Sequence, residues 1–177
     1  GEAVREMLSS FHAKFKRAKV FIETGRYAVG KAGFYVTHVL DKKISYGKTF
    51  VILENTLNGF LRPSLAQLVA GYAGSGNPSG NEPLFISLDA FEIASFRPEW
   101  EGTETVTLTG NLCTASDTIA EDIALPALKR GDPLVVSNAG SYGAVLSPMQ
   151  FSSQRRPAEL FFDETGRFYE TGKMLEK

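Results

Sequence analysis

Four short segments of the sequence combine residue types that could bind a ligand or transfer a proton. The first is Glu23-Thr24-Gly25-Arg26, which we place where a strand ends and a helix begins. Backbone N–H groups at such a junction, together with a guanidinium, suit the binding of a phosphate group. The alternative is an ordinary surface ion pair beside a glycine turn.

The second segment, residues 58–65, places an arginine at the start of a possible helix. Arg62 is followed by Pro63, a residue type that is common in the first helical turn. A guanidinium in this place can hold a carboxylate through two parallel hydrogen bonds. The alternative is a capped helix that carries a surface arginine.

The third and fourth segments carry the only thiol of the chain and an isolated tyrosine. Cys113 follows a predicted strand, within the polar loop 110–117. A thiol can donate a proton near neutral pH when its surroundings tune its pKa, although a lone cysteine is also commonly a small buried hydrophobe. Tyr142 lies among the small residues of 138–143, where its hydroxyl could reach a phosphate. The alternative is a turn tyrosine packed on the core.

The first residues of the chain predict a parallel α/β unit. Apolar residues at positions 4, 7, 8, 11 and 15 predict an amphipathic helix over residues 4–16. A short apolar run, Lys19–Glu23, predicts a buried strand, and a second helix is expected from Arg26 or Tyr27 to Leu40. Helix, buried strand and helix in this order are typical of the α/β barrel and doubly wound folds.

After Asp41 the pattern changes to short β-rich segments separated by Gly, Pro and Asn. The predicted strands are Thr49–Leu53, Leu84–Leu88, Thr103–Leu108, Leu134–Ser137 and Glu159–Asp163. A short helix is expected over Ser64–Tyr72, a turn near Gly143–Met149, and a long loop over Gly71–Pro83. The fold class is therefore mainly β (α+β), with a sandwich or barrel as its main domain.

Composition excludes several functional classes. The 177 residues include 19 basic and 20 acidic side chains, and a net charge of −1 argues against a dedicated nucleic-acid binder. One cysteine and two histidines leave no expected metal site, and both histidines are expected to be structural or surface residues. We find no membrane span and no signal peptide, so we expect a cytoplasmic protein without membrane or nucleic-acid partners.

Taken in order along the chain, the four segments resemble one family. Together with Leu125-Pro126, Gly131-Asp132 and Arg156-Pro157-Ala158-Glu159, they make residues 20–163 similar to the C-terminal part of the fold type III pyridoxal-phosphate decarboxylases. The diaminopimelate decarboxylase branch, which acts in lysine biosynthesis, is the nearest one. The resemblance implies that residues 1–41 end a (β/α)8 barrel and that residues 42–177 form the C-terminal β domain. The lysine that holds the cofactor would then lie outside these residues, and this chain alone would be inactive.

The resemblance also implies a role for each candidate residue. Glu23 would pair with the pyridine nitrogen of pyridoxal 5'-phosphate, and Gly25 and Arg26 would line the phosphate and substrate pocket. Arg62 would bind a substrate carboxylate, and Tyr142 would contact both the cofactor phosphate and the substrate. Cys113 would return a proton to Cα after carbon dioxide leaves. The Cys113 loop would enter the partner subunit's site in an obligate homodimer.

Two departures from the family pattern concern the distal end of the substrate. A tyrosine and a glutamate that grip this end are replaced by Ala66 and Thr114. Thr114 would then bind the substrate in a site of altered specificity. The buried ammonium at the distal end of diaminopimelate would lack a charged partner there. Two other functions stay open: a non-catalytic β module for binding or assembly, and a racemase that uses the same cofactor.

Overall fold

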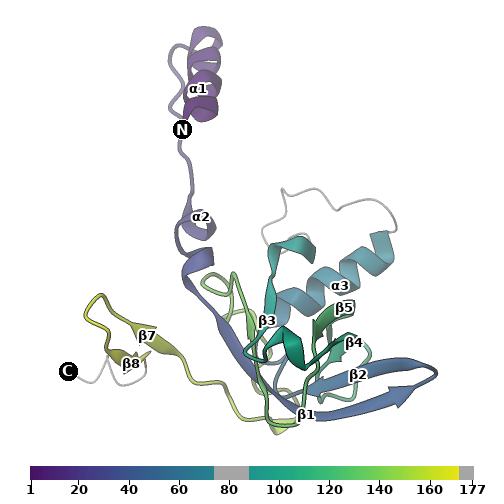
Figure 1. Ribbon diagram of the computed structural model, residues 1–177. Coiled ribbons are helices and arrows are strands. Elements are labelled where there is room, and N and C mark those ends of the chain that lie inside the picture. Colours follow the sequence, from purple (N-terminus) through teal and green to yellow (C-terminus); the bar gives the residue numbers. More distant parts are fainter. Residues whose placement is uncertain (74–87, 172–177) are drawn as a thin grey trace.

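The structure, a computed structural model, describes residues 1–73 and 88–171 (Figure 1). Its helices are α1 (Glu2–Lys14), α2 (Gly25–Val29) and α3 (Leu61–Ala73), with 3-10 turns η1 (Gly30–Ala32), η2 (Leu88–Ala90), η3 (Glu99–Glu101) and η4 (Phe151–Ser153). Its strands are β1 (Tyr35–Ser45), β2 (Lys48–Leu53), β3 (Ile93–Ser95), β4 (Thr103–Thr109), β5 (Thr118–Pro126), β6 (Pro133–Val136), β7 (Leu160–Phe162) and β8 (Phe168–Glu170).

A six-stranded sheet in the order β3-β6-β1-β2-β4-β5 forms the body of the chain. All neighbouring pairs are antiparallel except β2 and β4, which run parallel. The two edge strands, β3 and β5, approach each other, so the sheet is nearly closed into a barrel. Helix α3 packs against β5 (Figure 1). The prediction of a mainly β fold with a sandwich or barrel domain is confirmed.

Alternating residues of the strands fill the inside of this sheet. Thr37 and Val39 of β1 are buried while their neighbours Val36 and His38 are exposed, which is the two-residue period of a strand with one face on the core. The same side of the sheet carries the fully buried apolar residues Val51, Leu53, Val106, Leu108, Leu134 and Val136. Burial of this apolar surface is the main force that holds the strands together.

The N-terminal segment lies apart from this core. The predicted first helix is confirmed as α1, but none of its residues is buried, and it lies at the end of an extended segment (Figure 1). The predicted buried strand Lys19–Glu23 is wrong, because these residues form no strand and Phe21 is 86% exposed. A strand is stable only beside a hydrogen-bonded neighbour, and no described residue pairs with this segment.

The predicted second helix is correct only in its first part. Residues 25–32 form α2 and η1, and the backbone then becomes extended, so the helix expected up to Leu40 is wrong beyond Ala32. Residues 35–38 instead pair with β6, and Val39 begins the pairing with β2. Strand β1 therefore runs across the boundary that we expected between residues 41 and 42.

Most of the other predicted elements are confirmed. Thr49–Leu53, Thr103–Leu108, Leu134–Ser137 and Glu159–Asp163 overlap β2, β4, β6 and β7, and Ser64–Tyr72 lies within α3. The predicted strand Leu84–Leu88 lies outside the described residues except for Leu88, which begins η2; of the predicted loop Gly71–Pro83, only the α3 residues 71–73 are described. Residues 143–149 form non-helical turns. The sequence did not predict β3, β5 and β8.

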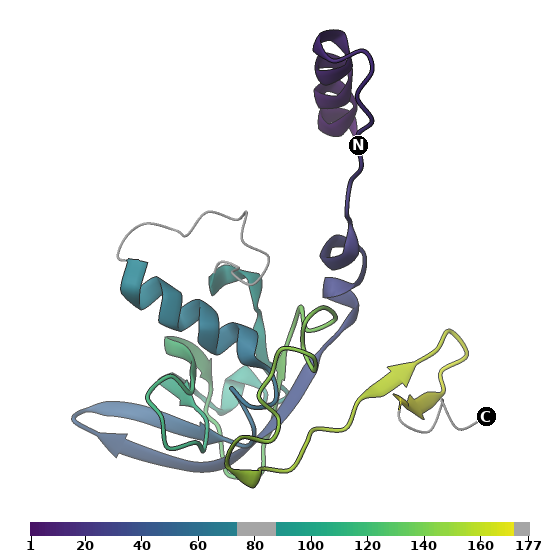
Figure 2. The same ribbon diagram turned by 180° about the vertical axis from the view of Figure 1, so that it is seen from behind.

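Strands β7 and β8 form a separate hairpin, which both views place away from the six-stranded sheet (Figure 2). Its apolar side chains Leu160, Phe161, Phe162 and Phe168 are exposed. None of the helices in the described part of the chain is long and apolar enough to span a membrane.

Candidate functional site

Two glycine-rich segments meet in direct backbone contact beside β1 and β6. The N–H of Gly140 donates to the carbonyl of Gly30 at 2.9 Å, and the N–H of Ala139 donates to the carbonyl of Gly33 at 2.9 Å. A Cβ atom on Gly33 would collide with the backbone of Gly140, and one on Gly140 would collide with the carbonyl oxygen of Val29. Glycine is therefore required for the two segments to approach this closely.

This contact brings Arg26 of α2 to Tyr142. The guanidinium carbon of Arg26 lies 5.7 Å from the centre of the Tyr142 ring, within the range of a cation–π interaction. Tyr142 has a φ of 57°, in the left-handed region that costs a non-glycine residue about 1–2 kcal/mol. Backbone strain of this kind commonly marks a functional position.

A second guanidinium reaches the same place from the first turn of α3. Arg62 is fully buried, with 0% of its side chain exposed, and its Nη1 donates to the carbonyl of Ser141 at 3.3 Å. The guanidinium carbon also lies 5.6 Å from the centre of the Phe91 ring. The Nε and Nη2 atoms of Arg62 and the Oγ atom of Ser141 are buried without a hydrogen-bond partner.

Electrostatics favour an anion at this point. Burial, and to a smaller extent the positive charge of Arg26, lower the pKa of Arg62 to about 10. Arg62 is still protonated near neutral pH. The guanidinium groups of Arg26 and Arg62 therefore place two positive charges close together. A buried N–H group without an acceptor destabilises the folded state, because it has lost its hydrogen bonds to water. A bound anion would accept hydrogen bonds from such groups and remove this cost. We call Arg26, Arg62, Ser141 and Tyr142 the arginine cluster; its chemistry suits a phosphate or a carboxylate.

The Cys113 loop, residues 110–117, connects β4 to β5 and is organised by one buried carboxylate. Asp117 accepts hydrogen bonds from the Leu57 N–H at 2.9 Å, the Leu112 N–H at 3.0 Å and the Thr56 hydroxyl. A Cβ atom on Gly110 would collide with Thr56 and with this carboxylate, which explains the glycine at the start of the loop. Asp117 thus fixes the loop against the turn that leads into α3.

Cys113 itself is exposed at the surface of its loop. The Thr114 hydroxyl lies 3.0 Å from the Ser116 hydroxyl, within the same loop. In the described part of the chain, no hydrogen bond, ion pair or ring contact joins Cys113 or Thr114 to the arginine cluster. The structure therefore brings together the predicted residues Arg26, Arg62 and Tyr142, but not Cys113 and Thr114.

Glu23 and Gly25 lie at the beginning of α2, in the segment that carries Arg26. Both are exposed, and Glu23 makes no hydrogen bond or ion pair with any other described residue. The Gly131-Asp132 segment has a structural role, because Asp132 forms an ion pair with Arg97 at 2.5 Å.

Two residues of these sites were missed by sequence reasoning. Ser141 and Asp117 lie within the segments 138–143 and 110–117, but the sequence indicated no role for either residue. Their adjacency to the candidate residues was the only sequence signal. Their contacts, to Arg62 and Thr56, join positions that are distant along the chain.

Comparison with known proteins gives the family. The family described as "Pyridoxal-dependent decarboxylase, C-terminal sheet domain" matches residues 26–140. The chain is 33% identical to an L-glutamyl-[BtrI acyl-carrier protein] decarboxylase of Niallia circulans, over 83% of this chain and 31% of that protein. It is 32% identical to a diaminopimelate decarboxylase of Deinococcus radiodurans, over 82% of this chain and 32% of that protein.

A solved structure shows the same fold. The diaminopimelate decarboxylase of Helicobacter pylori, in complex with L-lysine, is 28% identical and aligns with a TM-score of 0.58 over 82% of this chain and 30% of that one. The chain thus spans about a third of the length of the relatives that it matches. The strand order, the glycine contact and the arginine cluster all lie within or next to the matched residues. The chain belongs to the family of C-terminal sheet domains of pyridoxal-dependent decarboxylases.

Proposed function

We propose that this chain acts as the sheet domain of a pyridoxal-phosphate-dependent amino-acid decarboxylase, a carboxy-lyase. The observation that carries the proposal is the arginine cluster. It holds a fully buried Arg62 whose Nε and Nη2 atoms lack acceptors, beside Arg26 and Tyr142. Relatives at 31–33% identity are named as decarboxylases of three different substrates, which supports this reaction type.

The residues present fit pyridoxal 5'-phosphate. Arg26 and Tyr142, with the backbone at Gly25, would hold its phosphate, and Glu23 would pair with its pyridine nitrogen. When bound, the cofactor supplies a ring that withdraws electrons from the bond that breaks at Cα. Arg62 would bind a carboxylate of the substrate, because its two free nitrogen donors match the two oxygens of such a group.

Cys113 would return the proton to Cα after carbon dioxide has left. Its exposure and its separation from the arginine cluster of its own chain support a role in the site of a second copy. Each site would then combine the arginine cluster of one subunit with the Cys113 loop of its partner. We propose a homodimer with two shared sites on this ground.

The substrate is proposed to be an α-amino acid whose distal end differs from that of diaminopimelate. Ala66 is 5% exposed and belongs to the hydrophobic core, so it presents no polar group to a ligand. Thr114 supplies a hydroxyl in place of a charged group, and that hydroxyl already lies beside Ser116. A role in lysine biosynthesis would follow only if diaminopimelate were the substrate. The Niallia circulans relative is named for a carrier-protein substrate, which supports a wider range of possible substrates.

We also propose a cytoplasmic location, with an amino acid and a second copy as partners rather than nucleic acid or membrane. The free, exposed Cys113 is the type of thiol that persists in a reducing compartment. The net charge of −1 supports the absence of a nucleic-acid partner.

The test uses the full-length protein with pyridoxal 5'-phosphate and a panel of α-amino acids, among them meso-diaminopimelate, lysine, ornithine, arginine and glutamate. We expect the visible spectrum of the cofactor to change with one of them, together with stoichiometric release of carbon dioxide. Racemisation of an amino acid without carbon dioxide would identify a racemase instead. Neither a spectral change nor turnover with any amino acid would support a non-catalytic module.

A further inference from the structure

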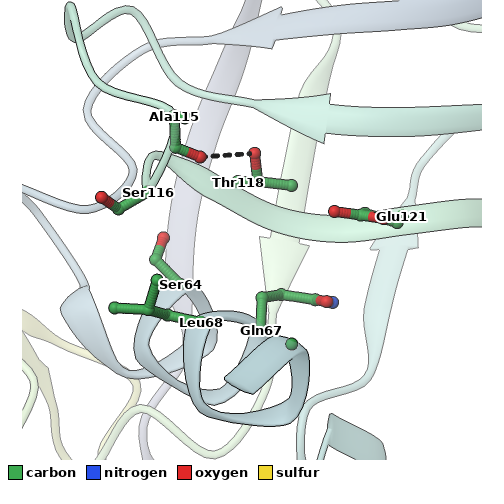
Figure 3. Close-up of a pocket in the computed structure, with 8 residues that line it drawn as sticks. Ser64, Gln67, Leu68, Ala115, Ser116, Thr118 and Glu121 are labelled. Carbon is green, nitrogen blue, oxygen red and sulfur yellow. Dashed lines mark hydrogen bonds between the residues drawn. The ribbon is translucent and has the colours of Figure 1, made fainter. Parts of the chain in front are cut away.

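A groove of about 260 Å³ lies between α3 and the strand that follows the Cys113 loop (Figure 3). It is lined on the helix by Ser64, Gln67, Leu68 and Gly71, and opposite the helix by Ala115, Ser116, Thr118 and Glu121. We call it the α3 groove. No residue of the arginine cluster lines it, so it is a separate feature of the molecule.

Ser64 gives the first indication that the α3 groove holds a ligand. Its side chain is only 1% exposed, and its Oγ atom has no hydrogen-bond partner in the chain. A helical serine normally satisfies its hydroxyl with a carbonyl of the preceding turn. Here the hydroxyl points out of α3 toward the opposite wall of the groove (Figure 3). A ligand in the groove would supply the missing partner.

The other polar groups of the α3 groove have free acceptors. The Gln67 side-chain N–H donates to the carbonyl of Ile119 at 3.4 Å, which leaves its carbonyl oxygen available. The Thr118 hydroxyl donates to the carbonyl of Ala115 at 3.4 Å, which leaves its lone pairs available (Figure 3). Glu121 is exposed, and its carboxylate makes no hydrogen bond or ion pair with any described residue.

The charge of the α3 groove is negative. Among the described lining residues, Glu121 is the only one with a charge, and there is no lysine, arginine or histidine. The groove extends along α3 toward its last turns, where the helix dipole is negative and the helix itself carries no basic residue. A ligand of this groove must therefore bring N–H donors and positive charge.

We propose that the α3 groove binds a linear alkylammonium group, with the Glu121 carboxylate as its counter-ion and the Ser64 hydroxyl as an acceptor of one of its N–H groups. Leu68, Gly71 and Ala115 provide an apolar wall for the methylene chain. Gly71 leaves this wall open, because no atom lies within 4 Å of the position of a Cβ there. Amino-acid decarboxylation yields primary amines, so the ligand class includes products of the proposed reaction, although the binding does not depend on that reaction.

The test measures binding to cofactor-free full-length protein by isothermal titration calorimetry, with pentylammonium as the probe. N,N,N-trimethylpentylammonium keeps the charge but has no N–H group, and pentanoate reverses the charge. We expect the trimethyl analogue to bind about tenfold more weakly, because hydrogen bonds from a charged donor are lost. We expect no binding of pentanoate to the α3 groove, so Ser64→Ala should leave any binding of pentanoate at the arginine cluster unchanged.

Two variants test the residues. Glu121→Gln should weaken pentylammonium about fivefold, as expected for an exposed ion pair, and Ser64→Ala should weaken it about tenfold. Glu164→Gln, at an exposed glutamate in the β7–β8 turn, is the matched control and should leave the affinity unchanged. Glu121 is exposed, so its variant is expected to fold even if Ser64→Ala does not.

Three outcomes would overturn the proposal. They are no binding of pentylammonium, binding of pentanoate that Ser64→Ala weakens, and an affinity for pentylammonium that Glu121→Gln and Ser64→Ala leave unchanged. None of these results bears on carbon dioxide release. The proposed decarboxylase function is therefore tested separately, by the assay of carbon dioxide release.

Discussion

The guanidinium of Arg62 donates a hydrogen bond to the backbone carbonyl of Ser141 at 3.3 Å, across 79 positions of the chain. This bond joins the first turn of α3 to the turn that carries Tyr142. The same turn contacts the α2 segment through Gly30 and Gly140. One buried cation thus links the chain segments that form the arginine cluster, and it keeps two nitrogen donors unused.

Replacing Arg62 by methionine should separate binding from stability. The variant keeps an unbranched apolar stem but removes the charge and all N–H donors. We expect the free energy of unfolding at neutral pH to fall by no more than about 1 kcal/mol, because a desolvation cost disappears together with the hydrogen bond. We expect acetate, a simple carboxylate, to raise the Tm of the wild type but not that of Arg62→Met. An acetate effect that persists in Arg62→Met would show that Arg62 does not bind the carboxylate.

The wild type and Arg62→Met should also differ in how their free energies of unfolding depend on pH. Burial lowers the pKa of Arg62 to about 10, well below its value in the unfolded chain. Below pH 10 both states hold the proton and the burial cost is constant. Between these two pKa values the unfolded state binds more protons, so wild-type stability should rise with pH relative to Arg62→Met. Urea unfolding of both proteins at about pH 8 and about pH 11 measures this difference. A difference that does not change with pH would contradict the shift.

Gly140→Ala should disrupt the arginine cluster through the backbone. Its Cβ atom would collide with the carbonyl oxygen of Val29, so we expect a loss of about 1–3 kcal/mol in the free energy of unfolding and weaker phosphate binding. Gly71→Ala is the control, because Gly71 lies in α3 with free space around it. That variant should gain up to about 1 kcal/mol from helix propensity. Equal effects of the two substitutions would rule out the close approach as the cause.

The sequence predicts the β core and the arginines of the candidate site, but not the contacts that join distant segments. Alternation of apolar residues is local, so β2 and β4 could be predicted from it. Residues 35–38 form a strand because β6, almost a hundred positions later, pairs with them, and the local apolar run favours a helix equally. Arg26, Arg62 and Tyr142 could be proposed from family resemblance. The role of Ser141 could not, because its carbonyl meets Arg62 only in the folded chain.

Asp117→Asn should loosen the Cys113 loop. The carboxylate accepts from two backbone N–H groups and one hydroxyl while it is 2% exposed, so we expect a loss of about 2–3 kcal/mol in the free energy of unfolding. Hydrogen exchange of the Leu112 amide should become faster. Asp122→Asn is the matched control, since its exposed ion pair with Lys48 at 3.0 Å is expected to contribute less than about 1 kcal/mol. Unchanged exchange at Leu112 would show that Asp117 does not hold the loop.

Mixing two inactive variants tests whether sites are shared between subunits. Arg62→Met and Cys113→Ala should each be almost inactive as full-length homodimers. In a mixed dimer, one site combines an intact Arg62 with an intact Cys113 from the other subunit. Random exchange of subunits should therefore restore about a quarter of the wild-type sites. If mixing restores no activity although mixed dimers form, Arg62 and Cys113 do not act across the interface.

The most direct test of the proposed function is the rate of carbon dioxide release by the full-length Cys113→Ala enzyme, measured beside its affinity for pyridoxal 5'-phosphate. Loss of a general acid commonly lowers turnover by two to four orders of magnitude. We predict that kcat falls by at least about a hundredfold while the affinity for the cofactor is unchanged, because Cys113 lies outside the arginine cluster. Turnover equal to that of the wild type would show that Cys113 is not the proton donor and would contradict this account.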